Sequence, residues 1–124
     1  MLTTKWKFLD YCRGNSNPIE DWYQSLSLEG KLLFDNILKT NQKTENPYDW
    51  IQFKSVRGNK YKGIWELKFK ADQKAYRMLL ILDKKVQQRA VLLVGCYHKQ
   101  RRYFPPDALD TALRNKKEFE SGKA

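Results

Sequence analysis

The chain has 124 residues, a length that favours a single domain spanning residues 1–124 around one hydrophobic core. Hydrophobic residues make up 41% of it, which excludes a disordered chain, and no apolar run reaches the ~18 residues of a membrane span. A net charge of +10 predicts a polyanionic partner, and the absence of a signal-peptide core at the N-terminus predicts a cytoplasmic protein.

Most of the positive charge lies between residues 54 and 103. This segment holds fourteen lysines and arginines against three acidic residues, a net charge of +11, while its flanks are close to neutral. A membrane-binding helix would repeat its charges every 3.6 residues, whereas these charges fall on expected strands and loops. Nucleic acid is therefore the favoured partner, and no membrane contact is expected.

The first third of the chain predicts a strand followed by a helical hairpin. Residues 5–11 partly alternate between polar and apolar, which is typical of a strand. A helix should begin at Pro18, because Asn17 can cap it and Pro suits the first helical position. Ser27 should cap a second helix that fades at residues 40–42. The apolar stripes of the two helices are Ile19, Trp22, Tyr23 and Leu26, then Leu33, Phe34, Ile37 and Leu38.

A long connection follows, from residue 43 to residue 63. Its first part, residues 47–53, could form one or two helical turns, and residues 54–63 form a basic loop punctuated by glycine. Such a loop is either simply solvated or mobile and in contact with phosphates, and the surrounding charge favours phosphate contact. The candidate RNA-binding residues of this loop are Arg57, Lys60 and Lys62.

Three strands with short connections are expected next, and they predict an antiparallel meander. Residues 64–70 alternate, so that one face is apolar and the other basic, and residues 75–82 form a central strand interrupted by Arg77. Residues 90–97 form the third strand. The alternation places Trp65, Leu67 and Phe69 opposite Glu66, Lys68 and Lys70, and groups Ala90, Leu92, Val94, Cys96 and His98 on one face.

A last helix is expected after the break at residues 104–107, with a narrow stripe of Leu109, Ala112 and Leu113 and an end at residues 121–122. The fold class is therefore α+β in the order β-α-α-β-β-β-α, with an antiparallel sheet covered by helices on one face. The other face would be open. If Lys68, Arg77 and His98 share it, they form a cationic hollow with one titratable group at its rim.

The residues suit metal-independent cleavage of RNA, in which the 2′-hydroxyl attacks the adjacent phosphorus. His98, with an ordinary pKa near ~6.5, could carry a proton, and cationic neighbours would lower that pKa. Arg77 could clamp a phosphate, with Lys68 and Lys99 as point charges. Tyr97 or Tyr103 could stack on a base or assist proton transfer, and Arg101 and Arg102 are further RNA-contacting candidates.

Plainer interpretations stand beside these roles. His98 could be an ordinary surface residue at a strand end, and Arg77 could pair with Glu66 across the sheet as a structural bridge. Cys12 and Cys96 match no metal spacing and are expected to be reduced packing residues. No cluster of acidic residues and histidine predicts a metal site, and no cofactor is expected.

Three segments together resemble a known family: Gly63-Ile64-Trp65-Glu66-Leu67-Lys68-Phe69, then Tyr76-Arg77-Met78-Leu79, then Val91-Leu92-Leu93 before a Pro-led helix. They are similar to the phage-derived, HigB-like branch of the RelE toxin superfamily. Relatives of this branch usually carry Arg where Lys68 stands, and many have His where Gly95-Cys96 stands here. The ending Tyr97-His98, in turn, resembles the Tyr-His end of HigB toxins, whose His is tied to activity.

The resemblance implies a RelE-like fold and the toxin of a type II toxin–antitoxin system. It implies an endoribonuclease that cleaves mRNA in the ribosomal A site. A cognate antitoxin, of the helix-turn-helix type, would hold it in check within a hetero-oligomer. Two other readings stay open: a ParE-like toxin that binds DNA gyrase without nuclease chemistry, and a phage-encoded RNA-binding protein without catalysis. Growth arrest would indicate either toxin, and cuts within translated frames would indicate the nuclease.

Overall fold

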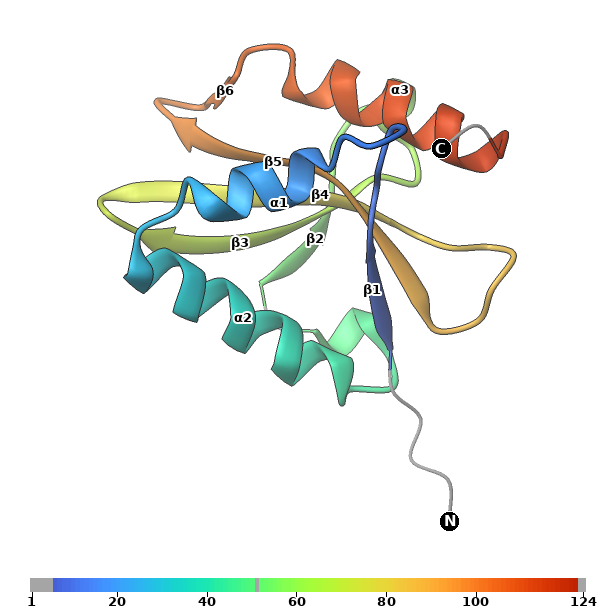
Figure 1. Ribbon diagram of the computed structural model, residues 1–124, viewed down its shortest axis with the longest axis horizontal. Coiled ribbons are helices and arrows are strands. Elements are labelled where there is room, and N and C mark those ends of the chain that lie inside the picture. Colours follow the sequence, from blue (N-terminus) through green and yellow to red (C-terminus); the bar gives the residue numbers. More distant parts are fainter. Residues whose placement is uncertain (1–5, 51, 123–124) are drawn as a thin grey trace.

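A six-stranded mixed sheet forms the centre of the molecule in the computed structural model, which describes residues 6–50 and 52–122 (Figure 1). The strands lie in the order β1-β5-β4-β3-β2, and β6 pairs with the outer part of β5. The elements are β1 Lys7–Asp10, α1 Pro18–Gln24, α2 Leu28–Gln42, the 3-10 helix η1 Pro47–Asp49, β2 Phe53–Ser55, the 3-10 helix η2 Asn59–Tyr61, β3 Trp65–Ala71, β4 Lys74–Leu82, β5 Arg89–Lys99, β6 Arg102–Phe104 and α3 Ala108–Glu120.

The predicted helical hairpin and meander are confirmed. Asn17 accepts a hydrogen bond from the Glu20 amide at 2.9 Å, and Ser27 accepts one from the Gly30 amide at 3.0 Å, so both helices begin where their caps predict. Strands β3, β4 and β5 pair antiparallel in sequence order. Lys5 and Ile51, which fall within two expected elements, lie outside the described ranges.

The expectation of a purely antiparallel sheet is wrong, because β1 runs parallel to β5. Phe8 pairs with Ala90 and Asp10 with Leu92. Strands joined by a hairpin must be antiparallel, but β1 and β5 are separated in the chain by α1, α2 and the three strands β2, β3 and β4, so no tight turn fixes their relative direction. The strands β2 and β6 also escape the sequence pattern, because three residues are too few to show alternation.

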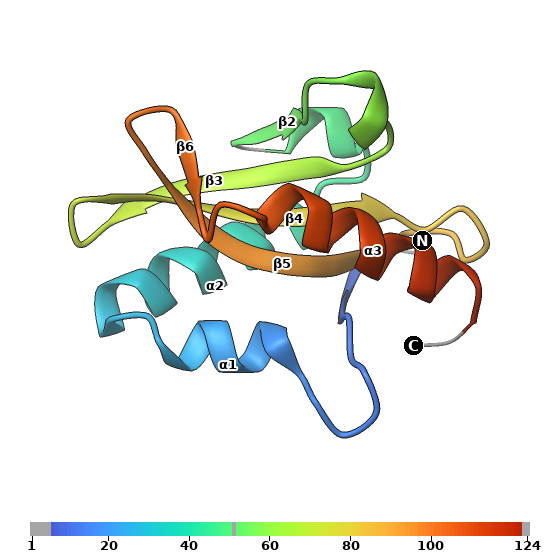
Figure 2. The ribbon, with the colours of Figure 1, turned by 90° about the horizontal axis from the view of Figure 1, so that it is seen from above.

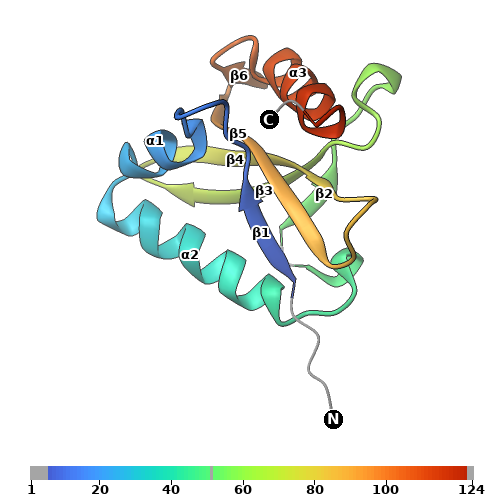
Figure 3. The same ribbon diagram turned by 45° about the vertical axis from the view of Figure 1, so that its right-hand side comes forward.

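Helices cover both faces of the sheet, which corrects the expectation of cover on one face only. Figure 3 shows the three helices around the strands, and their buried residues divide between two cores, with Ile19 of α1 and Phe34 of α2 in one and Ala108 of α3 in the other. The α3 helix buries Ala108 and Ala112 against an apolar patch of the second face that includes Leu79 and Leu93. That patch explains the correction: the inner half of the second face is as apolar as the first, so it needs its own cover.

A β-bulge in β5 changes which residues share a face. The pairing shifts between Leu79, which lies opposite Val94, and Leu80, which lies opposite Leu92, so that Leu93 is the extra residue. Val94, Cys96 and His98 follow the α3 side as expected, together with Leu93. Ala90 and Leu92 instead join the core beneath α1 and α2, contrary to the simple alternation.

Gly95 marks the closest approach of helix and sheet. A Cβ atom at this position would lie 2.1 Å from the Trp22 ring of α1. Trp22 in turn packs edge-on against Phe34 of α2, with ring centroids 5.1 Å apart. No side chain larger than hydrogen fits at position 95 without displacing this cluster.

Candidate functional site

The α3 helix leaves the outer part of the second face uncovered. Figure 2, seen from above, shows α3 over β4 and β5, with β2 and β6 beside it. The uncovered part forms a hollow of about 310 Å³, here called the basic hollow. It is lined by Lys54, Ser55, Val56, Arg57, Glu66, Lys68, Arg77, His98, Tyr103 and Leu109.

The register of the strands brings the predicted residues of the hollow together. Lys68 of β3 lies directly opposite Arg77 of β4. One row further out, Ala75 pairs with His98 of β5, and His98 pairs with Tyr103 of β6. Because alternate residues of a strand point to the same face, Lys68, Arg77 and His98 share one surface, as the cationic-hollow hypothesis requires.

Arg77 lies between an acid and the imidazole. Its Nε atom is 3.5 Å from Oε2 of Glu66, and its Nη2 atom is 3.2 Å from Nδ1 of His98. Glu66 is only 6% exposed, and it also accepts a hydrogen bond of 3.1 Å from the Tyr103 hydroxyl. Arg77 and Glu66 therefore form the ion pair that the plainer interpretation expected. Arg77 contacts His98 at the same time, through a different nitrogen atom.

His98 is held in its neutral form. Burial lowers the pKa of His98 below 6.5, the positive charge of Arg77 and, less, that of Lys68 lower it further, and the Glu66 carboxylate opposes them. A guanidinium can only donate hydrogen bonds, so Nδ1 accepts and the ring proton resides on Nε2. That Nε2 atom is buried and has no hydrogen-bond partner among residues 6–50 and 52–122.

Two other titratable groups of the site stay protonated. Burial first, and then the charge of Glu66, raise the pKa of the Tyr103 hydroxyl well above 10, so Tyr103 remains a hydrogen-bond donor. The Tyr103 ring also meets the His98 ring edge-on, with centroids 4.3 Å apart. Burial raises the pKa of Cys96 to about 12, and both Cys96 and Cys12 are free.

Two predicted catalytic residues lie away from the basic hollow. Tyr97 points to the opposite face of β5, where it stacks on Phe104 at 5.3 Å and meets Tyr76 edge-on at 6.2 Å. Lys99 is exposed at the end of β5 and does not line the hollow. Neighbours in a strand point to opposite faces, so the closeness of these residues to His98 in sequence does not bring their side chains to it.

The predicted RNA-binding residues are more dispersed. Arg57 lines the basic hollow, whereas Lys60 forms an exposed ion pair of 3.0 Å with Asp110 of α3. Lys62 lines a larger neighbouring hollow of about 840 Å³, which shares Ser55 and Val56 with the basic hollow but not its other side chains. Arg101 and Arg102 are exposed around the turn between β5 and β6.

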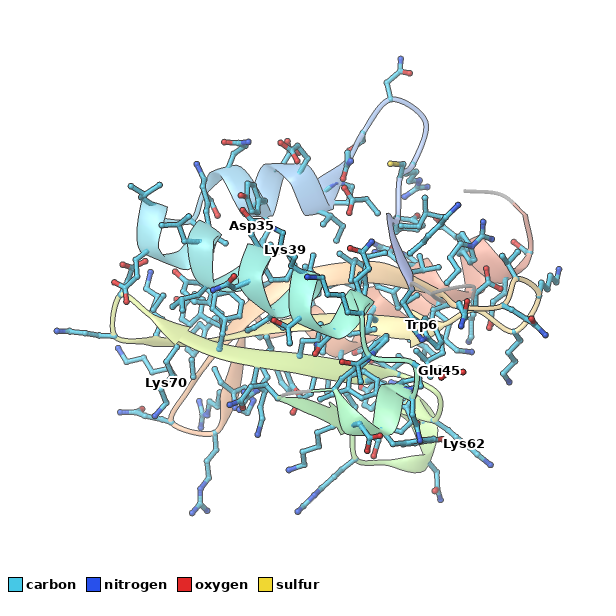
Figure 4. All side chains as sticks on the ribbon, turned by 90° about the horizontal axis from the view of Figure 1, so that it is seen from below. Trp6, Asp35, Lys39, Glu45, Lys62 and Lys70 are labelled. Carbon is cyan, nitrogen blue, oxygen red and sulfur yellow. The ribbon has the colours of Figure 1, made fainter. Side chains whose placement is uncertain are left out.

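Another hollow, which borders the basic hollow at Lys68 and Arg77, extends the cationic surface. It has a volume of about 360 Å³, and it shares Lys68 and Arg77 with the basic hollow while adding Lys70. In Figure 4, Lys62 and Lys70 project away from α2, the helix that carries Asp35 and Lys39. Lys54 was not predicted as a site residue, because β2 has only three residues and its sequence does not show which face each side chain takes. Glu66 was expected only as a structural partner of Arg77.

The arrangement defines a class: a small α+β domain with a cationic hollow that holds one neutral imidazole, a surface suited to phosphate groups. The chain belongs to the family described as phage derived protein Gp49-like (DUF891), whose model matches residues 21–117. This is a toxin-like family of the RelE type, and membership implies an antitoxin partner. Comparison with curated proteins finds no match.

No three His, Cys, Asp or Glu side chains within the described ranges gather closely enough to hold a metal ion. No helix there is long and apolar enough to cross a lipid bilayer.

Proposed function

We propose that the chain is the toxin of a type II toxin–antitoxin system and that it cleaves mRNA on the ribosome without a metal ion. The observation that supports this proposal is the placement of Lys68, Arg77 and His98 on one uncovered hollow. Membership of a toxin-like family agrees with it. The HigB-like character of the chain is part of the same proposal.

The reaction assigns one proton transfer to each end of the scissile phosphate. The 2′-oxygen forms a bond to phosphorus while the bond from phosphorus to the 5′-oxygen breaks, which leaves a 2′,3′-cyclic phosphate and a 5′-hydroxyl. His98 takes the 2′-hydroxyl proton at Nδ1, and the Lys68 ammonium gives a proton to the leaving 5′-oxygen. Proton exchange with water then restores both groups.

Arg77 stabilises the negative charge of the transition state. Its planar guanidinium can donate two parallel hydrogen bonds to the phosphate oxygens, whose negative charge grows in the transition state. Lys54 and Arg57 line the same hollow and can bind the flanking phosphates. The half-buried ring of Tyr103 offers a surface on which a splayed base can stack.

The first test is expression of the chain without its antitoxin, followed by primer extension on cellular mRNA. We expect growth arrest and cuts within translated frames. His98→Ala should abolish the cuts while ribosome binding persists. Lys39→Ala, which removes a cation from α2 on another side of the molecule, should cut like the parent chain. Unchanged cleavage by His98→Ala would remove His98 from the mechanism.

A binding toxin without nuclease chemistry is the second candidate. The observation that favours it is that Arg77 occupies Nδ1 of His98 and that Nε2 is buried, so the free protein presents neither nitrogen to a substrate. Growth arrest without mRNA cuts would support this candidate, whether the target is an RNA or DNA gyrase. Co-expression of an adjacent antitoxin gene should relieve the arrest under either candidate.

A further inference from the structure

The contact between Arg77 and Glu66 is longer than a strong ion pair. Hydrogen bonds between a guanidinium and a carboxylate typically measure about 2.7–2.9 Å, whereas Nε of Arg77 lies 3.5 Å from Oε2 of Glu66. The Nε atom is buried and makes no hydrogen bond to any residue in the described part of the chain. Arg77 therefore has unused capacity to bind an anion.

Glu66 is itself divided between two donors. The Tyr103 hydroxyl donates to Oε2, the same oxygen that lies closest to Arg77. A carboxylate oxygen that already accepts a hydrogen bond attracts a second donor less strongly. An incoming phosphodiester, whose two non-bridging oxygens share a full negative charge and can accept parallel hydrogen bonds from a guanidinium, can therefore compete for Arg77.

From this geometry we propose that Arg77 is a gate: Glu66 and a substrate phosphate compete for its guanidinium, and His98 gains a free nitrogen only when the phosphate wins. The inference rests on the proposed function for its substrate, RNA. Glu66 is a positioning residue in this scheme, because it acts on the reaction only through Arg77. The gate reconciles a covered imidazole in the free protein with a usable base in the complex.

The surroundings of His98 fit this scheme. Its charged and titratable neighbours are Glu66 and Lys68 on β3, Arg77 on β4 and Tyr103 on β6. Lys68 has no acidic partner within 4.0 Å in the described ranges, so it remains available for a phosphate while Arg77 moves. A phosphate between Arg77 and His98 would also favour a proton on the imidazole, which the reaction requires after the first transfer.

If Glu66 and a phosphate compete for Arg77, removing the charge of Glu66 should increase the affinity for RNA. Glu66→Gln keeps the size and a hydrogen-bond acceptor for Tyr103 but removes the charge that competes for Arg77. It should bind a 2′-O-methyl tetranucleotide, which cannot be cleaved, about fivefold more tightly than the parent chain. Asp72→Asn makes the same change in net charge in the exposed turn between β3 and β4 and should alter this affinity much less. If Glu66 merely positioned Arg77 for binding, Glu66→Gln would bind more weakly.

A second measurement keeps the inference testable if Glu66→Gln fails to fold. His98 is the one histidine of the chain, so its ring nitrogens give isolated ¹⁵N resonances. Saturation of the parent chain with the tetranucleotide should move the Nδ1 resonance as the contact with Arg77 breaks. An unmoved Nδ1 resonance at saturation, or a Glu66→Gln affinity equal to or below that of Asp72→Asn, would overturn the gate.

These measurements need neither a ribosome nor cleavage. A moving His98 resonance together with uncut mRNA in cells would keep the gate and refute the nuclease. Cleavage with a static His98 resonance would keep the nuclease and refute the gate.

Discussion

The close packing of Gly95 in β5 against Trp22 in α1 predicts a large loss of stability for Gly95→Ala. The added methyl carbon would lie 2.1, 2.3 and 2.4 Å from Cδ2, Cγ and Cε2 of Trp22. Carbon atoms pack best at about 3.5–4.0 Å, so the indole must retreat by about 1.5 Å. Trp22 cannot retreat freely, because it also packs against Phe34, Phe69 and Tyr76.

The expected cost follows from this geometry. Overpacking a tight core typically costs about 1–3 kcal/mol, and a clash with a ring held on several sides belongs at the upper end, about 3 kcal/mol. For a domain of this size that loss lowers the melting temperature by roughly 10 °C. Circular dichroism during heating measures the change.

Two further variants isolate the cause. Gly30→Ala introduces the same methyl group at a buried helical site, where the nearest atom is Leu26 Cβ at 3.3 Å, and it should change the stability by less than about 1 kcal/mol. Trp22→Leu should recover part of the loss in the Gly95→Ala background, with a coupling energy of at least about 1 kcal/mol. A Gly95→Ala protein that melts like Gly30→Ala would refute the argument.

Two other predictions concern the site and the α3 contact. Burial and Arg77 hold the pKa of His98 below 6.5, so the unfolded chain binds its proton first as the pH falls. Stability should therefore decline from pH ~6.5 down to the folded-state pKa, and a plot of melting temperature against pH should lose this decline in His98→Gln. Asn115→Ala removes a buried hydrogen bond of 3.0 Å from Asn115 Nδ2 to the Leu93 carbonyl and should cost about 1–3 kcal/mol in urea denaturation.

Each of these predictions has a matched control. A constant difference in melting temperature between the parent chain and His98→Gln, from pH 8 to pH 5, would show that His98 does not contribute to the pH dependence. Asn36→Ala, on the exposed surface of α2, should change the stability by no more than about 0.5 kcal/mol. Equal losses for Asn36→Ala and Asn115→Ala would contradict the importance of the bond to the bulge.

Part of the site could be predicted because its geometry is local. Lys68 and Arg77 sit on strands joined by a two-residue turn, Asp72-Gln73, in which both residues have positive φ. Such a turn fixes the register, so alternation alone places both side chains on one face. His98 lies beyond the bulge at Leu93, so it keeps its alternation with Val94 and Cys96, but whether it shares a face with Arg77 depended on a strand register that the sequence left open.

Other features could not be predicted in the same way. The bulge reverses the faces of Ala90 and Leu92, and it depends on how β5 fits both β4 and α3. The position of Lys54 in the hollow depends on the pairing of β2 with β3. The strand β2 has only three residues, which are too few to show a periodic pattern in the sequence. The contacts of Arg77 with Glu66 and His98 depend on side chains from three strands.

The sequence by itself determined the helix starts at Asn17 and Ser27, the meander, and the concentration of cations between residues 54 and 103. These features need only neighbours a few positions apart, because caps, alternation and charge are local properties. The tertiary structure alone decided the parallel pairing of β1, the seat of α3 on the second face and the sharing of Arg77 between Glu66 and His98. These depend on surfaces distant in the chain that must bury one another, and no local pattern records which will meet.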